Sequence, residues 1–228
     1  IVKRLMAIIS YSSKAKSYYE HLGFKRLINV APNAVEIDDS FNNMPVRHRR
    51  DDKENLNLVF VGRLIPEKDL EKLIEIVVDN KRFKLSVVGA GDPVYEDSLK
   101  MLAQPSSGRV EFLGHINATE LPSVLADKEL FVLPGRGGLA INHAMAAGLP
   151  VVCSEGDGTE DDLVIEGHTG FRFKDEDWRE LEKILCNALD RKKDLSLMGE
   201  NAANRIRSQF SIDSMVNVFV NTIKSFEK

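Results

Sequence analysis

Several features that define whole classes of proteins are scarce or missing in this sequence. Its two cysteines, Cys153 and Cys186, are too few for a disulfide framework and show no CxxC spacing. No apolar run approaches the roughly 20 residues of a membrane-spanning helix, and no signal peptide is visible. The net charge of −4 gives no support for binding nucleic acid. These absences favour a cytoplasmic globular protein with reduced cysteines.

The signatures of several enzyme classes are also missing. None of the five histidines stands in an HxxxH or HExxH pattern, which argues against a zinc site. There is no GxSxG turn of a serine hydrolase and no Walker phosphate loop. The run Gly89 to Val94 comes near the dinucleotide fingerprint but lacks its third glycine, so a turn leading into a helix is favoured over a nicotinamide site. We expect no metal and no cofactor.

What the sequence does contain is a regular alternation of short apolar runs and helical stretches between residues 56 and 208. The predicted strands are Leu58–Val61, Leu85–Val88, Val110–Leu113, Phe131–Leu133, Val151–Cys153 and Gly170–Phe173. The predicted helices are Asp69–Asp79, Val94–Ala103, Thr119–Ala126, Leu139–Ala147, Asp177–Leu189 and Asp194–Ser208. This order predicts a doubly wound α/β fold, in which helices cover both faces of a parallel sheet and ligands bind at the carboxyl ends of the strands.

The two ends of the chain are organised differently. Residues 1–35 predict a single strand–helix–strand unit, which cannot bury both of its faces alone. Its elements are expected at Leu5–Ser10, Ser12–His21 and Leu27–Val30. We therefore expect a fragment of a longer protein, in which this unit leans on a neighbouring molecule or on the helix predicted at Ile212–Phe226. Residues 36–55 are polar and charged, including the run RHRRDD, which is typical of a linker.

The stretch Phe131–Cys153 combines a strand, a glycine-rich loop, a helix and a second strand. Gly135, Gly137 and Gly138 form a loop without bulky side chains, and a helix follows from Leu139. The start of a helix leaves backbone N–H groups without partners, and the helix dipole adds roughly half a positive charge there. This stretch therefore predicts a binding site for an anion, phosphate above all.

Three further loops follow predicted strands. Arg63 and Lys68 follow the first strand and would either clamp a diphosphate or lie in a solvated loop. The segment Gly114–Ile116 follows the third strand and would contact a base or sugar, or form an ordinary turn. After the fifth strand, Thr159 is expected as the N-cap of a helical stretch that ends at Gly167, with Glu160 as an acidic residue in its first turn.

An ordered set of motifs covers nearly the whole chain. These are AxxxYSxxAKxYY, VxPNAV, FVGRL followed by Lys68, VVGAG, VEFLGH, FVLPG, GGLAINHAMAAGLPVV and IEGHTGF. Together they resemble the family 4 retaining glycosyltransferases of the GT-B fold. The resemblance implies that residues 56–208 form the Rossmann-like domain that binds a nucleotide-sugar donor. It also implies that residues 1–35 are a remnant of the acceptor-binding domain, and that residues 209–228 form a helix that crosses back to it.

The motif positions and the loops after the strands together define an expected donor site. The expected residues are Arg63, Lys68, Gly138, Leu139 and Ala140 for the diphosphate, Gly135, Gly137 and His143 for the sugar and ribose, and Gly114, His115 and Ile116 for the rim around the base. The family also carries two glutamates separated by seven residues, and these positions fall on Gly135 and His143. His143 can still hydrogen-bond a ribose as a shorter group, whereas Gly135 offers no side chain. No residue stands out as a catalytic base.

The resemblance implies a metal-independent transfer of a sugar, with retention, from a UDP- or GDP-sugar. Arg63, Lys68 and the helix start would neutralise the leaving diphosphate. The acceptor would be a glycan or a lipid-linked molecule held by the missing domain, which implies polysaccharide biosynthesis and peripheral membrane association. Unpaired strand edges in residues 1–35 favour a homo-oligomer, and the fragment alone is expected to be inactive. The loss of both glutamates supports an alternative, a non-catalytic nucleotide-binding or assembly module.

Overall fold

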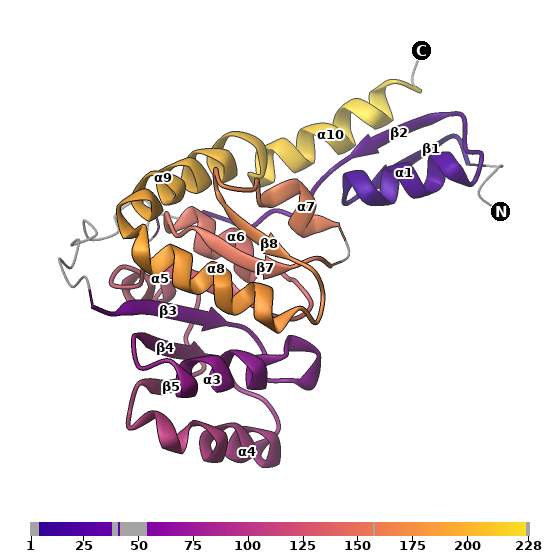
Figure 1. Cartoon of the computed structure of the whole chain (residues 1–228). Helices are drawn as coiled ribbons and strands as arrows, with labels where there is room; N and C mark the ends of the chain where they lie inside the picture. The colour runs from indigo at the N-terminus through magenta and orange to yellow at the C-terminus, as the bar shows by residue number, and fades with distance from the viewer. Residues whose placement is uncertain (1–4, 38–40, 42–53, 157, 227–228) are drawn as a thin grey trace.

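A computed structural model describes residues 5–37, 41, 54–156 and 158–226. Its main sheet has six strands, all parallel, in the order β5–β4–β3–β6–β7–β8 (Figure 1). The strands are β3 Leu56–Val61, β4 Phe83–Val88, β5 Val110–Gly114, β6 Leu130–Leu133, β7 Val151–Ser154 and β8 Gly170–Phe173. The predicted parallel α/β sheet is confirmed.

Helices connect successive strands of the main sheet, and two further helices follow its last strand. They are α3 Leu70–Asp79, α4 Pro93–Ala103, α5 Leu121–Leu125, α6 Ala140–Ala146, α7 Thr159–Leu163, α8 Trp178–Asp190 and α9 Lys192–Gln209. In α3, Leu70, Leu73, Ile74 and Val77 are buried and share one face because their spacing follows the helical repeat. Helix α4 begins at a proline behind the Asp92 N-cap, as the predicted turn requires.

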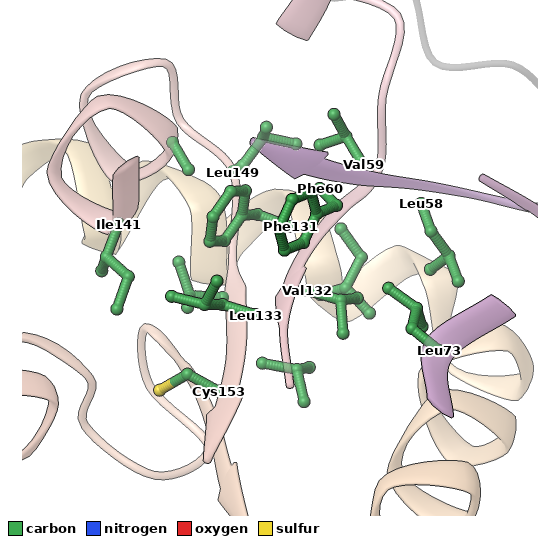
Figure 2. Close-up of a cluster of buried hydrophobic side chains, with 14 of the residues drawn as sticks. Leu58, Val59, Phe60, Leu73, Phe131, Val132, Leu133, Ile141, Leu149 and Cys153 are labelled. Atoms are coloured by element: carbon green, nitrogen blue, oxygen red, sulfur yellow. The ribbon is translucent and has the colours of Figure 1, made fainter. Parts of the chain in front are cut away.

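The core lies around the two central strands. Leu58, Phe60, Phe131 and Val132 are fully buried, and Figure 2 shows them gathered with residues of neighbouring strands and helices. Strands covered on both faces need apolar side chains on both, which explains their continuous apolar runs. Cys153 belongs to this core, and burial raises the pKa of its thiol, so it acts as a small apolar residue.

The order of the strands positions the site. Strand β3 pairs with β4 on one side and with β6 on the other, so the chain winds outward from β3 in both directions. In open parallel sheets, the loops on the two sides of such a switch point diverge and leave a crevice at the carboxyl edge. The loops after β3 and β6, which contain Lys68 and Gly135–Gly138, flank this switch point.

Most helix starts lie within two residues of the predicted ones, and local backbone geometry explains the differences at α7 and α3. The N-cap of helix α7 is Gly158, whose φ of 102° favours glycine. Thr159 is therefore the first residue of the helix and not its N-cap. The helix ends at Leu163 and does not reach Gly167, because the backbone of Val164 is extended. Helix α3 begins one residue later than predicted, because Asp69 takes a left-handed conformation after a 3-10 turn at Pro66–Lys68.

A second, small unit contains β1 Ala7–Ser10, α1 Ser13–His21 and β2 Leu27–Val30. The two strands pair in parallel, and helix α10, Ile212–Lys224, runs beside them away from the main sheet (Figure 1). The Asn29 side-chain amide donates to the Thr222 hydroxyl over 2.7 Å. The unit therefore leans on the last helix, which is one of the two arrangements expected. An oligomer through residues 1–35 stays a prediction.

The small unit also contacts the main domain. Lys14 Nζ donates to the Gly156 carbonyl over 2.9 Å, and the backbone N–H of Ser13 donates to Asp162 Oδ2 over 2.7 Å. The basic run at residues 47–52, in the predicted linker, lies outside the described residues. Phe41, from the same linker, is only 3% exposed and belongs to the main core. Within the described ranges, no helix combines the length and apolar character needed to cross a bilayer.

Candidate functional site

Lys68 meets the glycine-rich loop at the switch point of the sheet. Its ammonium donates hydrogen bonds to the carbonyls of Arg136 and Gly137, the latter over 2.6 Å. A Cβ built on Gly138 would lie 3.7 Å from the same nitrogen, so the ammonium lies beside this glycine as well. The structure thus brings Lys68 together with Gly137 and Gly138, and a cation lies where the sequence predicts a diphosphate.

Gly135 lies directly against the chain that carries Lys68. A Cβ at this position would lie 2.5 Å from the Lys68 carbonyl carbon and 2.7 Å from its Cα, which is too close for any side chain. The next residue, Arg136, donates its backbone N–H to the Glu67 carbonyl over 2.9 Å, and this bond holds the two loops together. The absence of a glutamate at residue 135 therefore has a steric reason in this structure.

Arg63 lies in the loop after β3, and its side chain is exposed. This loop is joined to the loop after β4, because Gly62 and Leu64 donate backbone hydrogen bonds to the Val88 and Ala90 carbonyls. Arg63 thus shares the carboxyl edge of the sheet with Lys68, but no contact places its guanidinium on the glycine loop. Its role in binding the diphosphate stays a prediction.

The two glycines after β4 allow this close approach of the loops. A Cβ on Gly89 would overlap the Gly62 carbonyl oxygen, and one on Gly91 would overlap the Leu64 carbonyl oxygen. Gly89 also has a φ of 144°, which favours glycine. Gly89 and Gly91, which resemble part of a dinucleotide fingerprint, therefore allow the loop after β4 to pack against the backbone of the loop after β3. This packing agrees with the turn that the sequence favoured over a nicotinamide site.

The residues predicted at the base rim lie at the end of the edge strand β5. The carbonyl of Gly114 accepts a hydrogen bond from the Gly89 N–H over 2.8 Å, so this turn joins the same set of loops. His115 is exposed, whereas Ile116 packs against the core. Strand β4 separates β5 from β3, so these residues share the edge of the sheet with Lys68 without touching the glycine loop.

His143 projects from α6 toward the chain that precedes the main sheet. Its ring stacks on that of Phe41, with 5.6 Å between the ring centroids and 14° between the planes. Phe41 therefore covers one face of the imidazole, a contact that motif spacing could not reveal. The predicted hydrogen bond from His143 to a ribose stays a prediction.

Two buried polar side chains that sequence reasoning missed support the helix and its loop. Asn142 is fully buried and donates from Nδ2 to the Asn33 carbonyl over 3.1 Å, which ties α6 to the turn after β2. Ser154, at the end of β7, donates to the Gly135 carbonyl over 3.1 Å. Asn142 lies beside the apolar stripe of the predicted helix, and a polar residue at such a place was the sequence signal that could have indicated a buried hydrogen bond.

Glu160 has a different position from the one expected of a first-turn acid. It is 1% exposed, and its carboxylate lies against Gly137 and Gly156. Burial raises the pKa of the Cys153 thiol, and the neighbouring Glu160 carboxyl raises it further, so Glu160 lies close to the core. The described part of the chain holds no group of three His, Cys, Asp or Glu side chains arranged for a metal ion.

Comparisons with known proteins identify a family. A model described as "Glycosyl transferases group 1" matches residues 41–205. An uncharacterized glycosyltransferase of Methanocaldococcus jannaschii is 27% identical over 168 residues, which are 70% of this chain and 42% of that protein. A GDP-mannose-dependent monoacylated alpha-(1-6)-phosphatidylinositol monomannoside mannosyltransferase of Corynebacterium glutamicum is 27% identical over 72% of this chain and 46% of its own. The chain spans less than half the length of both relatives.

Solved structures share the fold at low sequence identity. Anabaena HepE in complex with UDP superimposes with a TM-score of 0.79 and 21% identity, over 99% of this chain and 65% of HepE. Sucrose-phosphate synthase from Thermosynechococcus elongatus also gives 0.79, with 19% identity, over 98% of this chain and 59% of its own. The predicted Rossmann-like GT-B fold is therefore confirmed.

Proposed function

Because this chain belongs to the group 1 glycosyl transferases, we propose that it forms the donor-binding part of a retaining family 4 enzyme. The enzyme transfers a sugar from a nucleotide-diphosphate sugar to a glycan or lipid-linked acceptor. The observation that carries the proposal is the contact of Lys68 with Gly137 and Gly138 at the switch point of the sheet. A fixed cation beside a glycine-lined loop suits a diphosphate, because oxygen atoms can approach the backbone without meeting side chains.

In this mechanism the protein stabilises the leaving nucleoside diphosphate. The bond between the anomeric carbon and the distal phosphate oxygen breaks, and negative charge grows on that oxygen. The anomeric carbon forms a bond to a hydroxyl oxygen of the acceptor, and the proton of that hydroxyl passes to the leaving diphosphate. Lys68 and Arg63 compensate for this charge, which is the task that a metal ion performs in other transferases. We therefore propose metal-independent transfer. For this step, the ammonium of Lys68 must exchange its hydrogen bonds with loop carbonyls for bonds with phosphate oxygens.

The nucleotide of the donor is proposed as UDP or GDP. UDP is bound by the structural neighbour HepE, which has also been solved with UDP-glucose. The mannosyltransferase of Corynebacterium glutamicum depends on GDP-mannose. Both nucleotides present the same diphosphate to Lys68, so the site residues described above serve either donor. A role in polysaccharide biosynthesis, a cytoplasmic location and peripheral membrane association belong to the same proposal.

Isothermal titration calorimetry with UDP and GDP tests the diphosphate site. Charge-assisted hydrogen bonds each contribute about 1.5–3 kcal/mol, so the double variant Arg63→Ala/Lys68→Ala is expected to bind at least about tenfold more weakly. Lys81→Ala, which removes an exposed lysine before β4, serves as the matched control and keeps wild-type affinity. Equal affinities of the wild type and the double variant would contradict the proposal.

One observation favours a second function, a nucleotide-binding or assembly module without catalysis. The two positions that carry glutamate in the family are occupied by Gly135 and His143. Gly135 has no room for a side chain, and the ring of His143 stacks on that of Phe41, so neither residue replaces the family glutamate. Transferase assays with the wild type and His143→Glu, both made in the full-length protein that includes the acceptor-binding domain, separate the two functions. Activity that appears only in His143→Glu would establish the module, whereas wild-type activity would exclude it.

A further inference from the structure

The glycine-rich loop after β6 carries no acidic side chain of its own, yet a carboxylate lies against it. Glu160 reaches the loop from α7, and its side chain is almost completely buried. A Cβ on Gly137 would overlap Oε1 and lie 2.7 Å from the carboxylate carbon of Glu160. A Cβ on Gly156 would lie 2.8 Å from Oε2. The carboxylate therefore fills the space that these two glycines leave.

Two side chains from other elements, those of Lys68 and Glu160, contact Gly137. Its carbonyl accepts a hydrogen bond from Lys68 Nζ over 2.6 Å, and its α-carbon lies beside Glu160 Oε1. The same short piece of backbone thus lies between the ammonium of Lys68, from the loop after β3, and the carboxyl group of Glu160, from α7. Segments that follow β3, β6 and β7 meet at this one residue.

A carboxylate at this depth is costly for the fold. Glutamate is almost never fully buried unless its charge is compensated, because water solvates the charge better than the protein interior does. The position of the carboxylate beside the glycine loop offers a reason for the burial.

We propose that Glu160 is a positioning residue of the donor site, whose carboxylate holds Gly137 and Gly138 in the conformation that receives the distal phosphate and sugar. The inference rests on the proposed donor site and deepens it. Glu160 does not touch the ligand, since its side chain is closed off from solvent. It acts through the loop, and it supplies from α7 the acidic group that Gly135 has no room to carry.

Binding of a nucleoside diphosphate and of its monophosphate to the chain tests this role. Glu160→Gln keeps the size of the side chain and removes its charge. It is expected to lower the affinity for UDP about tenfold, equivalent to about 1.4 kcal/mol, and to leave the affinity for UMP within about twofold. GDP and GMP replace this pair if the wild type prefers guanine. Glu155→Gln, at an exposed carboxyl in the segment after β7, is the control and keeps both affinities.

The selective loss distinguishes positioning from general structural support. A role in stability alone would lower the affinities for UDP and UMP together, or neither, and either result would overturn the inference. Thermal melting of each variant identifies a folding defect. If Glu160→Gln does not fold, Glu160→Ala and the variants of Gly137 give the decisive measurement.

A double-mutant cycle tests the contact itself. Gly137→Ala places a methyl group where the carboxylate lies, so Gly137→Ala and Glu160→Ala are each expected to weaken UDP binding. Because both changes disrupt the same contact, the double variant should bind about as weakly as Glu160→Ala alone. Fully additive effects would overturn the inference. A wild type that binds neither UDP nor GDP would overturn the proposed function as well, which separates the two failures.

Discussion

Gly89 and Gly135 lie where any side chain would collide with the backbone of the loop after β3. The first glycine belongs to a motif that resembles a nucleotide fingerprint, and the second stands at a position where the family has glutamate. Their spacing in the sequence indicates function, whereas their surroundings in the structure indicate close packing. At the scale of a residue, the role of a glycine can therefore be assigned only when its neighbours in the structure are known.

Replacing Gly89 by alanine is expected to cost more stability than the same change at Gly108. Both glycines have positive φ angles, 144° and 84°, which alanine adopts at a cost of about 1–2 kcal/mol. Only at Gly89 would the methyl group also overlap a backbone carbonyl, that of Gly62. We expect a loss above about 3 kcal/mol for Gly89→Ala, measured by urea denaturation. Similar losses at the two sites would contradict the packing explanation.

Asp69 gives the protein a pH-dependent stability term of known sign. Burial, followed by the charges of Asp175 and Glu71, raises the pKa of its carboxyl above the ordinary 3.8. The folded state therefore holds this proton more tightly than the unfolded state does. Above the raised pKa the charged carboxylate costs stability, and the cost disappears as the pH falls through the raised value toward 3.8.

Asp69→Asn is therefore expected to stabilise the protein at pH 7. Asparagine tolerates the left-handed φ of 50° at this position, so the backbone is not strained by the change. The gain should be less than about 0.5 kcal/mol, because solvent screens a half-exposed group. It should shrink toward zero near pH 4, as seen by urea denaturation at both pH values. A gain that grows at low pH would contradict the assignment.

At the scale of elements, the strands of the main sheet and the presence of the short helices were predictable, but the ends of the short helices were not. Leu58–Val61 and Leu130–Leu133 are apolar on both faces because helices cover both sides of the sheet. Helices α5 and α7 have five residues each, too few for a reliable hydrophobic repeat, and a glycine in the left-handed region decides where α7 begins. Local turn geometry therefore overrode the sequence pattern.

The attachment of α10 to the small sheet depends on one well-defined polar contact. Thr222 is 4% exposed, accepts a hydrogen bond from the Asn29 amide and donates one to the Val218 carbonyl. Thr222→Val keeps the shape and removes both bonds, so it should destabilise the chain by about 1–3 kcal/mol. Faster amide hydrogen exchange in β2 would locate the effect. Thr119→Val, at an exposed site, is the control, and equal effects of the two changes would refute the contact.

At the scale of the whole molecule, the strand order places the candidate site. Because β3 lies between β4 and β6, Lys68 and Gly137 meet although 69 positions separate them in the sequence. A ligand bound at this junction contacts the two halves of the main sheet together. Binding of UDP or GDP should therefore stabilise the domain against global unfolding.

This stabilisation is measurable as a thermal shift. A ligand that binds only the folded state at 100 times its Kd adds about 2.7 kcal/mol, so saturating UDP or GDP should raise the Tm by several degrees. Lys68→Ala should reduce the shift at the same ligand concentration, while Lys81→Ala should retain it. A shift that is unchanged in Lys68→Ala would place the nucleotide elsewhere in the molecule.

The amino-acid sequence by itself determined the α/β class, the strands and longer helices, and the family likeness, because these depend on hydrophobic periodicity and on ordered local motifs. It also indicated that Lys68 and the glycine-rich loop belong to one site. Only the tertiary structure decided that Gly135 has no room for a side chain, that Phe41 covers His143, and that Glu160 lies beneath the loop. Each of these contacts joins segments that are distant in the sequence, and packing alone brings them together.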